Sequence, residues 1–116
     1  MDHKDLEAWK QAMLLVEQVY KTSARFPKYE LYGLSAQMRR AAVSIPSNLS
    51  EGAARNGTRE YINFLGISLG SLAELETQSI IASRLGYADT ADLLKSIKRV
   101  RALLVGLRNH LKSGIC

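Results

Sequence analysis

The stretch YINFLGISLGSLAELETQSIIA, residues 61–82, decides the fold class. Its apolar and small residues recur at alternating spacings of four and three, at Tyr61, Leu65, Ser68, Leu72, Leu75, Ser79 and Ala82. This spacing predicts that these side chains share one face of an α-helix. The other faces are apolar as well, because Glu74 and Glu76 are the only charged residues between Tyr61 and Ser83.

A helix that is apolar on every side is buried on more than one side. In a single four-helix bundle each helix keeps a solvated face, so we expect this helix to bury surface against another subunit. Gly66 and Gly70 would allow a close backbone approach, either to that subunit or to a neighbour within one bundle. The sequence favours neither location.

Helical periodicity also marks the rest of the chain. We expect helices over about 5–26, 34–54, 58–85 and 89–113. The first has a predicted inner face of Leu6, Trp9, Met13, Val16 and Tyr20. The second has Leu34, Met38, Ala41, Ile45, Asn48 and Leu49, and the fourth has Leu93, Ile97, Val100, Leu104, Leu107 and Leu111. Short loops favour antiparallel neighbours, so residues 1–116 are predicted to form one all-α, up-down-up-down four-helix bundle.

Prolines and glycines set the expected helix boundaries. Pro27 ends the first helix, since the residue before a proline is disfavoured in the α region. Pro46 lies inside the second helix and should kink it. Thr58 is a candidate N-cap for the third helix, and Gly86 suits the position after its end.

Composition restricts the class of protein. The chain has 116 residues, which fits one domain. Its charged start is not that of a signal peptide, and its most apolar stretch, about ten residues from Phe64 to Ala73, is too short to cross a membrane. Cys116 is the only cysteine and is expected to be an incidental thiol. We therefore expect a cytoplasmic protein that does not associate with membranes.

The positive charge is concentrated at the end of the chain. From Leu93 onward there are six basic residues and no acidic one, whereas the rest of the chain has ten basic and eleven acidic residues. The six basic residues are Lys95, Lys98, Arg99, Arg101, Arg108 and Lys112. Basic rows of this kind attract nucleic-acid phosphates. They are also compatible with a solvated helix face whose cations suit the helix C-terminus. The absence of acids favours a polyanion, and Arg39 could extend the patch.

A polar stripe is predicted on the second helix. Its members follow spacings of three and four: Gln37, Arg40, Ser44, Asn48 and Glu51. One interpretation is a buried hydrogen-bond network in which Arg40 pairs with Glu51, since a buried carboxylate needs a partner. The other is a surface that faces a pore or a partner. We favour the buried network.

Residues typical of catalysis or metal binding do not converge in the sequence. His3 and His110 lie far apart along the chain, and neither has a second ligand three or four residues away. No Glu-x-x-His pair of the kind that holds metals in helical bundles occurs. We expect no catalytic residue, no metal and no cofactor.

The stretch YGLSAQMRRAAVSIPSNLSEG, from Tyr32 to Gly52, resembles the signature of the four helix bundle protein family, whose founders are encoded in intervening sequences of bacterial 23S ribosomal RNA genes. Other parts of the chain match too: Asp5-Leu6 with Trp9, Phe26-Pro27, Phe64-Leu65, and Gly70-Ser71-Leu72 with Glu74-Leu75-Glu76. The resemblance covers nearly the whole chain.

The resemblance implies a homopentamer of four-helix bundles and supplies no catalytic residue. It also implies a distant relation to the accessory variability protein of diversity-generating retroelements, a basic protein thought to bind nucleic acid and a reverse transcriptase. Two hypotheses follow: a nucleic-acid-binding oligomer that uses the basic helix, and a protein-interaction scaffold that uses the apolar third helix.

Overall fold

The computed structural model describes residues 3–114, and every regular element in that range is helical. The four long helices are α1 (Glu7–Ser23), α2 (Leu34–Ala54), α3 (Thr58–Arg84) and α4 (Ala91–Lys112). Two short 3-10 helices precede α1 and α2, namely η1 (His3–Asp5) and η2 (Lys28–Glu30). The predicted all-α class with four helices is confirmed. Cys116, expected to be an incidental thiol, lies outside the described residues.

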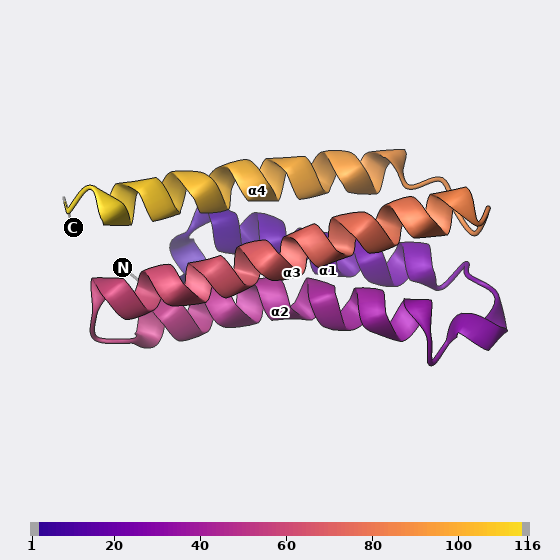
Figure 1. Ribbon diagram of the computed structural model, residues 1–116, viewed down its shortest axis with the longest axis horizontal. Coiled ribbons are helices and arrows are strands. Elements are labelled where there is room, and N and C mark those ends of the chain that lie inside the picture. The colour runs from indigo at the N-terminus through magenta and orange to yellow at the C-terminus, as the bar shows by residue number, and fades with distance from the viewer. Residues whose placement is uncertain (1–2, 115–116) are drawn as a thin grey trace.

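The helices lie side by side along the long axis of a molecule that measures 47 × 22 × 20 Å (Figure 1). α1 contacts α2 and α4, and α3 contacts the same two helices. Within residues 3–114, α1 does not contact α3, and α2 does not contact α4. Each helix thus has two neighbours and one outward side. The turn between α2 and α3 lies at one end of the molecule, and the other two connections lie at the opposite end (Figure 1).

The inner faces predicted for the last two helices are confirmed. In α3 the buried residues include Leu65, Ser68, Leu72, Leu75, Ser79 and Ala82. In α4 they are Leu93, Ile97, Val100, Leu104 and Leu111, and Leu107 is partly buried against the same core. Two hydroxyls in this core are satisfied by backbone carbonyls, since Ser68 donates to Ile45 and Ser79 to Leu75. Buried polar groups must be paired in this way to avoid a large desolvation cost.

The inner face predicted for the first helix is wrong. α1 buries a neighbouring stripe of smaller residues, which comprises Ala8, Ala12, Leu15 and Val19. The predicted stripe lies on the flank of the helix: Leu6, Trp9 and Val16 are partly buried, and Met13 and Tyr20 are 37% and 45% exposed. The two stripes are offset by one residue, which is a rotation of about 100° around the helix axis. Both are apolar, so periodicity alone could not decide which of them faces the core.

α2 has the range expected from the sequence and continues through Pro46, whose ring is buried. Gly52 lies inside this helix and permits its closest approach to α3. A Cβ atom at Gly52 would lie 2.8 Å from the Cβ of Phe64 and 3.1 Å from a ring carbon of Tyr61. The glycine therefore brings the two helices together just before their short turn.

The helix ends differ slightly from the expected bounds. α1 ends at Ser23, and the chain then forms a turn in which the Phe26 amide donates to the Ser23 carbonyl before Pro27. Thr58 is the first residue of α3, and its predicted N-cap position is taken by Gly57. Gly86 has φ +74° directly after the end of α3, the left-handed conformation expected of it.

Candidate functional site

The cations of α4 divide into an outer group and a flank that faces α3. Lys95, Lys98 and Arg99 are exposed, as their spacing predicts. The guanidinium of Arg101 pairs with Glu76 of α3, with 2.9 Å between Nη2 and Oε1. The flank also holds Arg108, which is partly buried, and beyond it Lys112 is exposed. The outer group therefore presents its charge to solvent, whereas Arg101 is partly neutralised.

Arg39 does not join the α4 cations. Its side chain lies on the flank of α2 that faces α1, where Nε donates a 2.8 Å hydrogen bond to the Ser23 hydroxyl. The guanidinium also stacks over the Tyr20 ring, 4.9 Å from the centroid. Because α2 and α4 do not contact each other within the described residues, Arg39 and the basic helix belong to different surfaces.

The polar stripe of α2 forms a network only at its centre. The Ser44 and Ser71 hydroxyls lie 2.8 Å apart and link α2 to α3, and the Asn48 amide donates to the Ser44 carbonyl and hydroxyl. The remaining members are exposed: Gln37, Arg40 and Glu51. The expected Arg40–Glu51 pair is absent from the described structure, and Glu51 instead pairs with Arg55, 3.4 Å away on the next turn. Because these three side chains are exposed, solvent can satisfy their hydrogen bonds, and they do not need partners within the protein.

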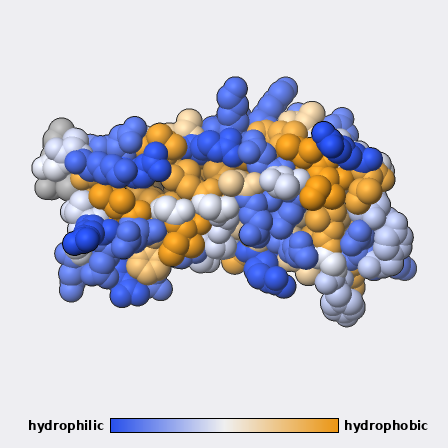
Figure 2. Space-filling view, viewed as in Figure 1, coloured by the Kyte–Doolittle hydropathy of each residue, from blue (hydrophilic) through white to orange (hydrophobic). Residues whose placement is uncertain are grey.

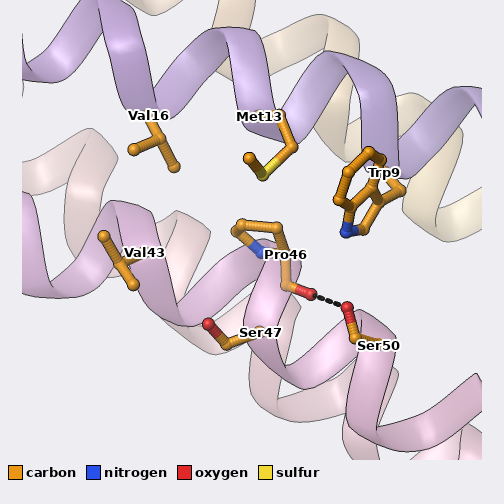
Figure 3. Close-up of a pocket in the computed structure, with 7 residues that line it drawn as sticks. All are labelled: Trp9, Met13, Val16, Val43, Pro46, Ser47 and Ser50. Atoms are coloured by element: carbon orange, nitrogen blue, oxygen red, sulfur yellow. Dashed lines mark hydrogen bonds between the residues drawn. The ribbon is translucent and has the colours of Figure 1, made fainter. Parts of the chain in front are cut away.

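An apolar groove of about 320 Å³ runs between α1 and α2 (Figure 3). Trp9, Met13 and Val16 point from α1 toward Val43 and Pro46 of α2. The Ser50 hydroxyl also lies in the groove, where it donates to the Pro46 carbonyl at 2.9 Å, so its proton is not available to a ligand. The sequence predicted Trp9 and Met13 as core residues, whereas the structure places them at the edge of the core, around an open groove.

α3 leaves a second apolar surface uncovered. Ile67, Ile80 and Ile81 are between 40% and 50% exposed. In Figure 2, orange atoms gather along the middle of the face, over α3, between blue atoms over α4 and α2. A Cβ atom built at Gly66 or Gly70 would meet no atom within 4 Å. Neither glycine therefore serves a close approach within the bundle.

A cluster of aromatic side chains lies at the end of the molecule opposite the α2–α3 turn. The Tyr87 hydroxyl donates to Glu30 at 2.8 Å and lies 3.3 Å from the Tyr29 hydroxyl. Hydrogen bonding to Tyr29 and Glu30 raises the pKa of Tyr87. Tyr32, next to this cluster in the chain, is 93% exposed. The sequence analysis did not single out these tyrosines, and their exposure could not be inferred from spacing because they lie outside the long helices.

Two features are absent from the described residues. Across residues 3–114, His, Cys, Asp and Glu side chains do not gather in a group of three or more that could hold a metal ion. Over the same range, each helix is too short or too polar to cross a membrane.

Residues 4–107 match the family model described as 23S rRNA-intervening sequence protein. The matched range includes all of α1, α2 and α3 and most of α4. No curated protein gives a significant match to the chain.

Proposed function

We propose that this chain, which belongs to the 23S rRNA-intervening sequence protein family, is a non-enzymatic protein that binds the backbone of RNA or DNA as a homo-oligomer. We further propose that the subunits are antiparallel up-down-up-down bundles, that the oligomer is a pentamer, and that it acts in the cytoplasm. The basic face of α4 is the binding surface in this proposal.

The observation that carries the nucleic-acid proposal is the unpaired outer face of α4. Lys95, Lys98 and Arg99 are exposed, and none of them has an ion-pair partner within residues 3–114. The last acid in the sequence is Asp92, in the first turn of α4, so the remaining turns have no carboxylate of their own. From Lys95 to Lys112 the helix rises about 25 Å, enough to face several phosphates of one strand.

Such a surface binds through charge and not through base recognition. Each lysine or arginine that neutralises a phosphate releases a bound counterion, which favours binding at low salt. Asn109 and His110 are the only exposed amide and imidazole side chains on α4, so the surface offers little to base edges. We therefore expect binding with little sequence preference.

The two uncovered apolar surfaces support self-assembly. The α1/α2 groove and the outer face of α3 belong to different sides of the bundle, since α1 and α3 do not contact each other. When one subunit carries two different apolar surfaces, contact between the groove of one copy and α3 of the next is head-to-tail. Such contacts form a ring when the rotation between copies closes, and an open filament when it does not. Gly66 and Gly70 on α3 would let the next subunit approach closely. The number five rests on the family resemblance. In a ring, the fields of several α4 helices would add.

Retention of a mixed-sequence RNA or DNA pool over a salt series tests the nucleic-acid proposal. We expect retention at low salt and a steep loss as salt rises. The double variant Lys98→Gln/Arg99→Gln should lower the slope of log affinity against log salt by about 1.5. A matched control, Lys10→Gln/Arg84→Gln, removes the same charge from exposed positions outside α4 and should leave the slope nearly unchanged. Absence of retention at low salt would refute the proposal.

The groove also favours a second candidate function, a scaffold that binds another protein. Its lining is mainly apolar and its shape is concave, which are the features of a site for an apolar side chain or helix face. Salt separates the two functions, because docking by apolar contact does not weaken steeply as ionic strength rises. A partner whose affinity is insensitive to salt but lost in Met13→Ser would identify the scaffold function.

A further inference from the structure

A second pocket, of about 280 Å³, lies where α1, η2 and α2 meet. Phe26, Pro27 and Leu31 are apolar residues of its lining, and they are called the apolar wall below. Lys28, Ser35 and Arg39 are cationic or polar residues of the same lining. None of the lining residues belongs to α4. Its lining thus combines a surface for an organic group with donors for an anion.

Arg39 is held in place before any ligand arrives. Its Nε donates to the Ser23 hydroxyl at 2.8 Å, and that hydroxyl is itself within 3.3 Å of the Tyr20 carbonyl, to which it donates. The guanidinium carbon lies over the Tyr20 ring, and this cation–π contact further restrains the side chain. The two Nη groups make no hydrogen bond or ion pair within residues 3–114. A planar, restrained guanidinium with free terminal donors is suited to bidentate contact with an oxyanion, at a small entropic cost.

Ser35 supplies an independent indication of a ligand. The residue is 98% buried, since its exposed fraction is 2%, and its hydroxyl makes no hydrogen bond with any described residue. The oxygen is not fully enclosed, since the fully buried side-chain atoms without a partner in the described residues are Gln78 Oε1 and Arg108 Nε, so the hydroxyl is open to the pocket. Ser35 lines the pocket and is the second residue of α2, close to the positive end of the helix. A ligand oxygen in the pocket would give it the missing partner.

The acid closest in sequence to this pocket is already engaged. Both oxygens of Glu30 are used: Oε1 accepts from the Leu34 amide at 3.1 Å, and Oε2 accepts from the Tyr87 hydroxyl at 2.8 Å. Lys28 is exposed and has no ion-pair partner within residues 3–114. Neither Lys28 nor Arg39 forms an ion pair within residues 3–114, and the Glu30 carboxylate is held by two neutral donors away from both cations.

We propose that this pocket binds a phosphate monoester whose organic group rests on the apolar wall. A phosphate monoester carries about −1.5 to −2 charges at neutral pH, which matches the two cations, whereas a carboxylate would leave one of them unbalanced. The phosphate oxygens accept from Arg39, Lys28 and Ser35, and a nucleoside covers Phe26 and Leu31. The source is a free nucleotide or the phosphorylated end of a nucleic-acid strand. This site does not depend on binding by α4.

Titration of the intact protein with adenosine 5′-monophosphate, adenosine and inorganic phosphate tests the site, with binding followed by calorimetry and by NMR shifts of residues around the pocket. We expect the nucleotide to bind more tightly than either of its parts. Arg39→Gln should weaken binding of the nucleotide about tenfold or more, as expected for loss of a charge-assisted contact. The neighbouring Arg40→Gln is the matched control, because Arg40 is exposed and lies outside the pocket.

Lys28→Gln is a second test, and it should not disturb folding, because the Lys28 side chain is exposed. It should weaken nucleotide binding several-fold while the melting temperature stays unchanged. Short single strands with a 5′-phosphate or a 5′-hydroxyl separate the two sources: an Arg39-dependent preference for the phosphorylated strand assigns the site to strand ends, and binding of the free nucleotide alone assigns it to nucleotides.

Three results would overturn the inference: no binding of the nucleotide, equal binding of nucleotide and adenosine, or equal loss in Arg39→Gln and Arg40→Gln. Failure here is distinguishable from failure of the α4 proposal. Lys98→Gln/Arg99→Gln should leave nucleotide binding intact, and Arg39→Gln should leave the salt-dependent retention of long strands largely intact.

Discussion

α1 and α4 both pack against the core of the bundle, but they bury side chains of different size. α4 buries its large residues, including Ile97 and Leu104, and presents lysines and arginines to solvent. α1 buries Ala8 and Ala12 and leaves Met13 at the edge of a groove. α4 therefore buries its large apolar side chains in the core of its own bundle, whereas α1 leaves part of its apolar surface exposed. In the proposed oligomer, this available surface of α1 contacts another subunit.

The largest expected effect is in α4. Leu104 is completely buried, so Leu104→Ala removes apolar contacts and leaves a cavity, at a cost of about 2–5 kcal/mol in the free energy of unfolding. Urea unfolding followed by circular dichroism, at one protein concentration, measures it. The matched change on α1, Leu14→Ala, truncates a side chain that is 55% exposed and should cost less than about 1 kcal/mol. Similar losses in the two variants would contradict the assigned burial.

A substitution in the opposite direction tests the small buried residues of α1. Ala12 is completely buried, so Ala12→Leu inserts atoms where there is no room and should destabilise the fold by about 1–3 kcal/mol. The same unfolding assay applies. If α1 instead buried the stripe of Trp9 and Met13, as the sequence suggested, Ala12→Leu would be nearly neutral.

The smallest expected changes in the free energy of unfolding are in the polar stripe of α2. Within this one helix, a part-buried side chain can be compared with an exposed one. Ser44→Ala removes the hydroxyl contact with Ser71 and one of the two acceptors for the Asn48 amide, and should cost about 1 kcal/mol. Glu51→Ala breaks an exposed pair with Arg55 and should change the free energy of unfolding by less than about 0.5 kcal/mol. A sharp drop in melting temperature for Glu51→Ala would restore the buried network that the sequence favoured.

Periodicity predicted the inner faces of α3 and α4 correctly. In α4 the stripe was easy to identify, because basic residues flank it. In α3 the other faces are apolar too, and the buried stripe is the one in which leucines alternate with small residues such as Ser68 and Ser79. Gly86 was also predictable, since a left-handed residue after a helix is ordinarily glycine.

The remaining features depend on contacts that spacing does not encode. The Ser23 hydroxyl that holds Arg39 is sixteen residues away in the chain, and the direction of the guanidinium depends on how α1 packs against α2. Glu51 pairs with Arg55 because Arg55 lies one turn further along, at the end of the helix, whereas Arg40 lies eleven residues earlier. On α1 two adjacent stripes were both apolar, and the arrangement of the neighbouring helices selected the one with alanines.

The central claim is that the apolar surface left open on α1 and α3 is covered by other copies of the chain. Light scattering at micromolar concentration measures this directly, on the wild-type protein and on the neighbouring variants Met13→Ser, in the groove, and Leu14→Ser, outside it. We predict a wild-type mass that is a multiple of 12.9 kDa, five subunits if the family resemblance holds, with a lower mass for Met13→Ser and an unchanged mass for Leu14→Ser. A wild-type mass of 12.9 kDa would contradict the account.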